Sequence, residues 1–437
     1  MAIVTDTQRD VAGAPLTRAP VHPARRWISL CLLMLVAVLS YVDRQIFTLF
    51  QDDIKVELGF DDGQLGMLTG LSFALFYALA AFPIARYADR GDRGLVVALS
   101  VMVWSAATAF CGAASGFWTM MLARIGLAAG EAGAGPASNS LLVEVFPPER
   151  RVLVISAMLA ASGVGLSGGL ALAGWLSTMF SWREVFLIVG LPGILLGIIV
   201  WLFVAEPRRG MDATVRSSQL QVPLGSVLKT MLGSTSLRWV AVVLTFVPIT
   251  GFALIIWGAS FFQRVHGMDK SETGFWLGGA MAAGLVIGNL LAGWLGDRYG
   301  KARPQFNGIL AGAGLLVAFP FALLFALGTN PYVALVCFMV VKFMMTLHLG
   351  PIIALSFAQV PISMRAMLSA TINMFIGLAG TGIGGTLAGY LSQYFSADYG
   401  DLSLRPALAV LSLCLLIGGT AAFMAARTVV VHPDAEG

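Results

Sequence analysis

The sequence has few charged residues, cysteines and histidines for its length. Charged side chains make up 11% of the 437 residues, whereas soluble domains average about 25%, so a soluble chain of this size would lack the charges to cover its surface. The 4 cysteines show no CxxC spacing and the 4 histidines no HxxxH spacing, which argues against a disulfide framework, a metal centre or a lipid-modifying metalloenzyme. These scattered residues are Cys31, Cys111, Cys337, Cys414, His22, His266, His348 and His432.

Two further absences narrow the function. No GxxxxGK[ST] loop is present, so the sequence predicts no ATP-binding site, and energy for transport has to come from a gradient or from the substrate itself. The basic residues are scattered among loops instead of clustered on one face, which argues against nucleic-acid binding. We therefore predict no enzyme activity, no cofactor, no metal and no nucleic-acid partner.

The sequence is rich in long apolar runs. Hydrophobic residues make up 58% of the chain, and a run of about 20 apolar residues crosses a bilayer as a helix. Twelve such spans follow one another as two sets of six, which predicts an all-α integral membrane protein. The first set covers about residues 27–50, 64–85, 95–115, 117–143, 153–180 and 185–204, and the second about 239–262, 273–295, 306–327, 332–358, 366–391 and 407–426.

The polar segments divide the chain into five predicted parts: a tail over 1–24, an N-terminal bundle over 25–205, a central loop over 206–238, a C-terminal bundle over 239–428 and a tail over 429–437. Residues 51–63, which carry five acids, are expected to form an aqueous loop, and 223–231 a short surface helix. Most lysines and arginines fall in the tails, the central loop and the connections on the same side. The positive-inside rule therefore places both termini in the cytoplasm.

The two sets of spans repeat each other. The connection after the second span, Ala85-x-x-x-Asp89-Arg90-x-x-Arg93, returns after the eighth as Gly293-x-x-x-Asp297-Arg298-x-Gly300-Lys301. Glycines 165, 169 and 174 of the fifth span likewise return as glycines 380, 384 and 389 of the eleventh. Parallel six-span repeats are typical of transporters whose site lies at the midplane between the halves. We predict alternating access by rocking of one half on the other.

The repeated connection resembles the G-x-x-x-D-R-x-G-R-R motif of the major facilitator superfamily, with Ala85 and Asp92 replacing the two glycines in the first copy. Within that superfamily, Tyr41-Val42-Asp43-Arg44 and Arg124-Ile-Gly-Leu-Ala-Ala-Gly-Glu131-Ala are similar to motifs of the Spinster branch, with Ser40 and Ala128 as departures. The resemblance implies twelve helices in two pseudo-symmetric bundles. It also implies transport of lysolipids, sphingosine-1-phosphate or related amphipathic molecules, with proton coupling proposed for some members.

The first and fourth spans carry charges inside the membrane, namely Asp43, Arg44, Arg124 and Glu131. Such charges are costly unless they face a partner or a water-filled cavity, so they are functional candidates. Asp43 and Arg124 lie at similar depth, and we predict that they pair across facing helices, with Glu131 two turns further along the face of Arg124. We predict proton coupling through Asp43 and Glu131 and substrate binding by Arg44 and Arg124. The structural alternative is an ion pair that only locks the two helices together.

Three further residues are predicted to bind substrate. Lys342 lies near mid-membrane among methionines and phenylalanines, which suits an anionic headgroup with an acyl chain, although such a lysine can also snorkel to the surface. His348 is a candidate ligand, although a histidine in an apolar helix is more often a packing residue. Asn373 is expected to line the cavity or to hydrogen-bond between helices.

The repeated motif predicts a mechanical gate at the cytoplasmic face. Asp89 can meet the positive N-terminus of a helix from the other half, and Arg90 or Arg93 can pair with Glu144 at the end of the fourth span. Such contacts would exist only when the cytoplasmic side is closed. Solvated loop charges would account for the arginines but not for the repeated aspartate. The superfamily resemblance implies gating roles for Asp89, Arg93, Asp297 and Arg298.

Two glycine patterns at 163–168 and 380–385 match GxGxxG. A dinucleotide site needs a strand before this motif, whereas both copies lie inside apolar spans, so we predict close helix packing and bending there.

The sequence as a whole predicts a monomeric, multi-pass protein of a bacterial-type inner membrane, surrounded by lipids, that moves an amphipathic anion with protons. A small organic anion:proton symporter or a drug exporter stays open, because the same fold serves them equally. A non-transporting receptor would not need a gate repeated in both halves.

Overall fold

The computed structural model describes residues 22–207, 223–300 and 303–432, except for the side chains of Asp89 and Arg90. Most of the predicted tails, residues 208–222 of the predicted central loop and Lys301 fall outside these residues. Helices are the regular secondary structure of the described chain, which confirms the all-α fold class. Ten helical segments are long and apolar enough to cross a membrane, and one of them, Ile362–Arg427, contains two successive spans.

Six spans form the first half. The fourth of them, α5, is not among the ten apolar segments, since it is rich in glycine and alanine and contains Arg124 and Glu131, yet it packs against α3 and α4 inside the bundle. The second span is interrupted by one π-helical turn, η1. The elements are α1 (Pro23–Leu58), α2 (Asp62–Gly66), η1 (Met67–Leu71), α3 (Ser72–Arg90), α4 (Arg93–Gly112), α5 (Phe117–Val145), η2 (Pro148–Arg150), α6 (Arg151–Leu176) and α7 (Trp182–Phe203).

Six more spans form the second half, preceded by α8, which confirms the predicted surface helix. α8 turns only Val227 and Met231 inward and packs on α9 and α13. The elements are α8 (Leu224–Gly233), α9 (Thr235–His266), α10 (Lys270–Leu295), η4 (Gly296–Gly300), α11 (Pro304–Leu327), α12 (Pro331–Phe357), α13 (Ile362–Ile376), η5 (Gly377–Gly384), α14 (Gly385–Tyr399), η6 (Gly400–Ser403) and α15 (Leu404–Arg427).

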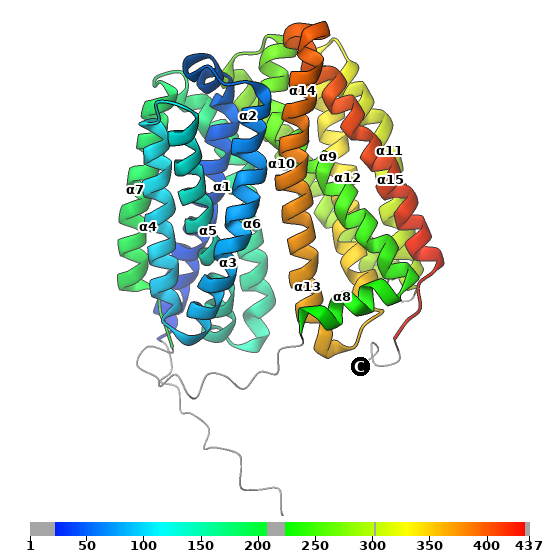
Figure 1. Ribbon diagram of the computed structural model, residues 1–437. Coiled ribbons are helices and arrows are strands. Elements are labelled where there is room, and N and C mark those ends of the chain that lie inside the picture. Colours follow the sequence, from blue (N-terminus) through cyan, green and yellow to red (C-terminus); the bar gives the residue numbers. More distant parts are fainter. Residues whose placement is uncertain (1–21, 208–222, 301–302, 433–437) are drawn as a thin grey trace, which may run out of the picture.

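The two halves stand side by side as bundles (Figure 1). We call the end where α1 begins and α15 ends the terminal face, and the opposite end, where α1 and α9 end, the distal face. In Figure 1 the terminal face is at the bottom, with α8 lying along it, and α2 and α14 approach each other at the top. Contacts between the halves are made chiefly by α6 with α10 and by α2 with α14, so the halves meet through equivalent helices of the two repeats.

The structure corrects the predicted loop over residues 51–63. α1 continues for two more turns and ends at Leu58, where Gly59 adopts a φ of 70° and caps the helix, a conformation that glycine takes without a Cβ penalty. Asp61 then begins α2 with a capping box to Gln64. The acids of this segment are therefore held on a rigid helix end, where several of them meet basic residues of the second half.

Glycines allow the halves to approach closely near the distal face. A Cβ built on Gly174 in α6 would lie 2.9 Å from the carbonyl oxygen of Lys270, and one built on Gly389 in α14 would lie 3.0 Å from Cα of Gly66. Real Cβ atoms do not come this close to a neighbouring backbone, so only glycine fits. Gly174 and Gly389 are among the glycines that repeat between the fifth and eleventh spans. The close packing predicted for residues 163–168 and 380–385 is confirmed in part, because a Cβ on Gly165 or Gly384 would meet a neighbouring helix, whereas Gly163 and Gly168 have no atom within 4 Å of such a Cβ.

Candidate functional site

A buried ion pair joins the first and fourth spans at the centre of the first half. Nε and Nη2 of Arg44 in α1 both donate to Oε2 of Glu131 in α5, with an Nε–Oε2 distance of 2.9 Å. The Glu131 side chain is 1% exposed and that of Arg44 is 28% exposed. The guanidinium of Arg44 also lies over the ring of Phe73, 4.5 Å from its centroid. The Glu131 carboxylate is therefore buried inside the bundle, whereas the Arg44 guanidinium is partly accessible.

Arg124 lies next to this pair without a carboxylate partner. Its Nε donates to the carbonyl of Leu68 in η1 at 3.1 Å, and its guanidinium stacks over Phe47 at 4.6 Å and lies 5.5 Å from Phe73. Its Nη1 is buried and makes no hydrogen bond. Phe73 thus lies beside two guanidinium groups, and one of them keeps a buried donor without a hydrogen-bond partner.

The predicted pair between Asp43 and Arg124 is wrong for this conformation. Oδ2 of Asp43 accepts a hydrogen bond from Thr108 Oγ1 of α4 at 3.2 Å, while its Oδ1 is buried without a partner. Equal depth brings two residues to one level of the bundle, but the rotation of each helix decides which side chains face each other. α1 turns Arg44 toward α5 and Asp43 toward α4.

The candidates of the second half lie apart from this cluster. Lys342 is 7% exposed and donates from Nζ to the carbonyl of Gly251 in α9 at 3.1 Å, so it is held inside the bundle and does not snorkel. His348 is buried, and its Nδ1 contacts the carbonyl of Met345 on its own helix, as a packing residue would. Asn373 is exposed on α13.

The Arg93 prediction is confirmed in part. Arg93, 1% exposed, pairs with Glu144 of α5 at 2.8 Å, as predicted, and also with Glu206 beyond α7 at 2.7 Å. Arg93 and Glu144 belong to the first half and Glu206 follows directly after its last span, so these contacts do not require the two halves to meet. The expectation that the Arg93–Glu144 pair exists only in a closed state is corrected. The side chains of Asp89 and Arg90 lie outside the described residues.

The second copy of the motif is placed at the end of α10. Asp297 and Arg298 lie in the π-helical turn η4. Arg298 donates to the hydroxyl of Tyr299 at 3.2 Å and lies over Trp294 at 5.9 Å. These contacts are local, and a role in gating stays a prediction.

A network on the distal face joins the two halves, and the sequence did not predict it. Arg264 at the end of α9 donates to Asp52 of α1 at 2.8 Å and to Asp62 of α2 at 2.8 and 2.9 Å. Asp62 also accepts from Lys55 at 2.7 Å and from Ser392 of α14 at 2.6 Å. We call these five residues the distal lock. Arg264 is 10% exposed, against 3% for Asp62 and 18% for Asp52, so the lock is largely desolvated.

Further hydrogen bonds lie beside the distal lock. Gln51 donates to Ser260 at 2.6 Å, Gln263 donates to the carbonyl of Leu49 at 3.1 Å, and Lys270 pairs with Asp53 at 2.9 Å. These hydrogen bonds and ion pairs between the two halves, and those of the distal lock, lie on the distal side of Arg44. The sequence contained one signal for this network: residues 51–62 carry five acids, and only a few basic residues are available on the same face to pair with them.

Two repeated six-helix halves, joined at one face by ion pairs and carrying charges at half depth, define a secondary transporter. The chain belongs to the Major Facilitator Superfamily, whose family model matches residues 33–385. This membership confirms the prediction of a multi-pass membrane transporter with a small-molecule substrate.

Relatives in the family move different substrates. The chain is 30% identical over 403 residues to an MFS-type efflux pump of Mycolicibacterium smegmatis, with 91% of each chain covered. It is 26% identical to the D-galactonate transporter of Escherichia coli, covering 91% of this chain and 96% of that one.

The fold matches a crystal structure of a bacterial homologue of the human lysosomal transporter Spinster in an inward-facing and unoccupied conformation. The TM-score is 0.83 at 28% identity, with 94% of this chain and 98% of that chain covered. The predicted Spinster-like resemblance is thereby confirmed.

Proposed function

We propose that this transporter moves an amphipathic organic anion across a bacterial plasma membrane together with protons, using Asp43 and Glu131 as proton-accepting groups. The observation that carries the proposal is the buried Arg44–Glu131 pair beside Arg124, whose Nη1 lacks a partner. A proton on Glu131 cancels its charge and releases Arg44 to bind an anionic group. Proton and substrate binding are then linked, because both act on one guanidinium.

The substrate class follows from the residues around the two guanidinium groups. Arg44 and Arg124 offer charge-assisted hydrogen bonds to a phosphate or carboxylate, and Phe47, Tyr41 and Phe73 supply apolar surface within contact of them. In the second half Lys342 offers a further ammonium, and His348 and Asn373 lie on the same or the next span. A charged head with an apolar body suits this combination, as in lysophospholipids or sphingosine-1-phosphate.

The alternative is a small organic anion:proton symporter or a drug exporter. The likeness to the D-galactonate transporter, over 91% of this chain, favours a sugar acid, which two arginines would also bind. The likeness to the efflux pump favours export. These readings share the charged site and differ in whether an acyl chain is required.

We place the terminal face in the cytoplasm, following the positive-inside rule, and regard the chain as a monomer with domain boundaries as predicted from its polar segments. The described state is then sealed on the outside by the distal lock, and Arg44 is reached from within. Gating at the terminal face is assigned to Asp89, Arg90, Asp297 and Arg298, with Arg93 and Glu144 holding the ends of the adjacent helices.

A competition experiment tests the substrate class. Purified protein in liposomes would be given a labelled lysophospholipid, with unlabelled lysophospholipid or galactonate as competitor. We expect lysophospholipid to compete and galactonate not to, and Arg44→Gln to abolish uptake while Arg183→Gln, at an exposed pair on the distal face, retains it. A parallel assay with labelled galactonate completes the test: uptake of galactonate but not of lysophospholipid would transfer the assignment to the sugar-acid symporter. Equal lysophospholipid uptake by the two variants would refute the site.

A further inference from the structure

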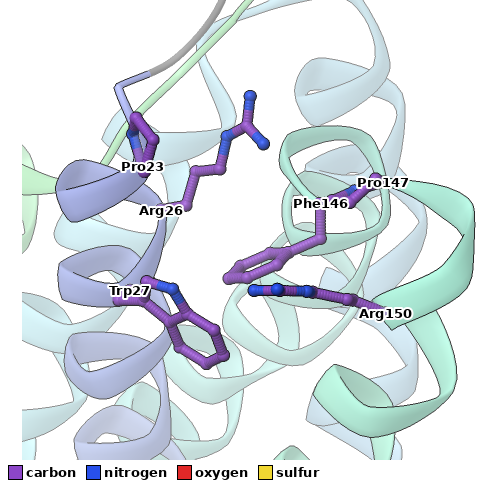
Figure 2. Close-up of a pocket in the computed structure, with 6 residues that line it drawn as sticks. All are labelled: Pro23, Arg26, Trp27, Phe146, Pro147 and Arg150. Atoms are coloured by element: carbon purple, nitrogen blue, oxygen red, sulfur yellow. The ribbon is translucent and has the colours of Figure 1, made fainter.

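A second site lies at the terminal face, away from the ion pair of Arg44. It is a pocket with a volume of about 290 Å³ between the start of α1, the end of α5 and the turn that leads into α6. Figure 2 shows the six lining side chains, with the Arg150 guanidinium beside the Phe146 ring and directed toward Trp27, and the Arg26 guanidinium on the opposite side of that ring. The lining residues are Pro23, Arg26, Trp27, Phe146, Pro147 and Arg150.

The pocket has a rigid aromatic wall. Trp27 and Phe146 pack edge to face at 5.3 Å, and Phe146 is only 3% exposed. The guanidinium of Arg150 lies 5.7 Å from the centroid of the Trp27 ring, a cation–π distance. Pro147 and Pro148 follow Phe146 directly and restrict the backbone of the turn. The side chains and backbone of this wall are therefore already held in place before a ligand binds.

The charge of the pocket selects an anion. Arg26 and Arg150 both line it. Their sequence neighbours Arg25 and Arg151 are also basic and donate to the carbonyls of Phe203 and Val143. Glu149 is the acidic side chain of the connecting turn and is exposed. Arginines from two separate elements can hold the two free oxygens of one phosphate diester.

The position of the pocket favours the phosphate of a membrane lipid over a phosphate in solution. Lipid-facing apolar side chains begin immediately beside it, with Ile28 45% exposed on α1 and Leu153 56% exposed on α6, while Trp27 itself is 40% exposed. Tryptophan and arginine together mark the boundary between hydrocarbon and headgroups. A phosphate held there is attached to acyl chains that run along this apolar surface.

We propose that this pocket binds the headgroup of an anionic phospholipid from the adjacent leaflet, with the phosphate on Arg26 and Arg150 and the glycerol against Trp27. The inference is independent of the proposed substrate. All lining elements belong to the first half, so a bound lipid anchors that half to the leaflet and does not bridge the two halves. Lipid binding is then expected to be the same in both conformations of the transporter.

Native mass spectrometry of the detergent-solubilised protein tests this. Dioleoylphosphatidylglycerol should be retained in preference to dioleoylphosphatidylcholine, with affinity falling about fivefold for Arg26→Gln or Arg150→Gln and about 25-fold for the double variant. Replacing both with lysine should keep most of the affinity. Arg427→Gln, an exposed arginine of the same face in the other half, is the matched control and should change nothing.

Three results would overturn the proposal. Equal retention of the two lipids by the wild-type protein would show that no anionic headgroup is selected. An equal loss in Arg427→Gln would show a diffuse charge effect. Displacement of the lipid by glycerol phosphate at the same concentration would show that the pocket binds a soluble phosphate ester and that the acyl chains do not contribute to binding. The wild-type comparisons stand even if the double variant fails to fold, which its melting temperature would reveal.

Discussion

Replacing Arg264 with glutamine removes the residue that holds the distal lock together. Asp52 loses its guanidinium partner, whereas Asp62 keeps Lys55 and Ser392. Removing one partner of a buried ion pair costs about 3–5 kcal/mol, and the contacts left to Asp62 favour the lower figure of about 3 kcal/mol. In the distal-open state both carboxylates are hydrated, so this cost falls on the sealed state alone.

A change of about 3 kcal/mol corresponds to a factor of roughly 100 in the equilibrium between the two states. A protein that is 99:1 in favour of the sealed state would become a nearly even mixture. Spin labels at positions 56 and 394, where Val56 is 83% and Tyr394 76% exposed, report the separation of α1 and α14 at the distal face. Double electron–electron resonance should show one short distance in the wild type and a second, longer one in Arg264→Gln.

Arg183→Gln provides the matched control for this measurement. Arg183 pairs with Glu57 at 2.9 Å on the same face, but the pair is 33% and 48% exposed and both partners belong to the first half. An exposed pair contributes about 0–1 kcal/mol, so the distances should stay as in the wild type. The reasoning fails if Arg264→Gln leaves the distance distribution unchanged, or if Arg183→Gln alters it equally.

Three further predictions concern other parts of the molecule. Arg93→Ala should lower the free energy of unfolding by about 3 kcal/mol, because two buried glutamates each lose an ion pair with one guanidinium. Thermal denaturation measures this change, and Arg86→Ala, at an exposed arginine, is the control. Gly389→Leu should prevent the two halves from sealing the distal face, so the labelling of a cysteine introduced on that face should increase. Unchanged labelling would contradict the close packing of α14 on α2. Thr108→Val removes the donor to Asp43 and should alter the pH dependence of transport, whereas Thr108→Ser should preserve it.

Hydropathy and the repeats sufficed to predict the twelve spans, because most of them are long and apolar and the two halves repeat the same glycines and connections. Residues 51–58 were predicted as loop because their acids look solvated. The partners of Asp52 and Asp53, Arg264 and Lys270, lie more than 200 positions away, and that of Glu57, Arg183, lies 126 positions away. Local composition contains no information about such contacts. The helix end is therefore stabilised by tertiary pairing that the sequence pattern does not show.

The site was predicted at the level of residues but not of partners. Asp43, Arg44, Arg124 and Glu131 stood out because charge is rare inside apolar spans. Their pairing depends on the rotation of each helix, which is set by packing over the whole bundle, so the structure pairs Arg44 with Glu131 and not Asp43 with Arg124. The aromatic contacts of the guanidinium groups were missed for a further reason: phenylalanine is common in membrane spans and gives no local signal.

The central claim is that the charged site couples an amphipathic anion to protons. Liposomes containing the purified protein and a pH-sensitive dye would be given a lysophospholipid, sphingosine-1-phosphate or a small carboxylate, for the wild type, Asp43→Asn and Glu131→Gln. The account predicts that a lipid anion moves protons in the wild type and in neither variant. Equal substrate movement in all three proteins without a proton signal would contradict it and leave the buried charges as a structural lock in a facilitator.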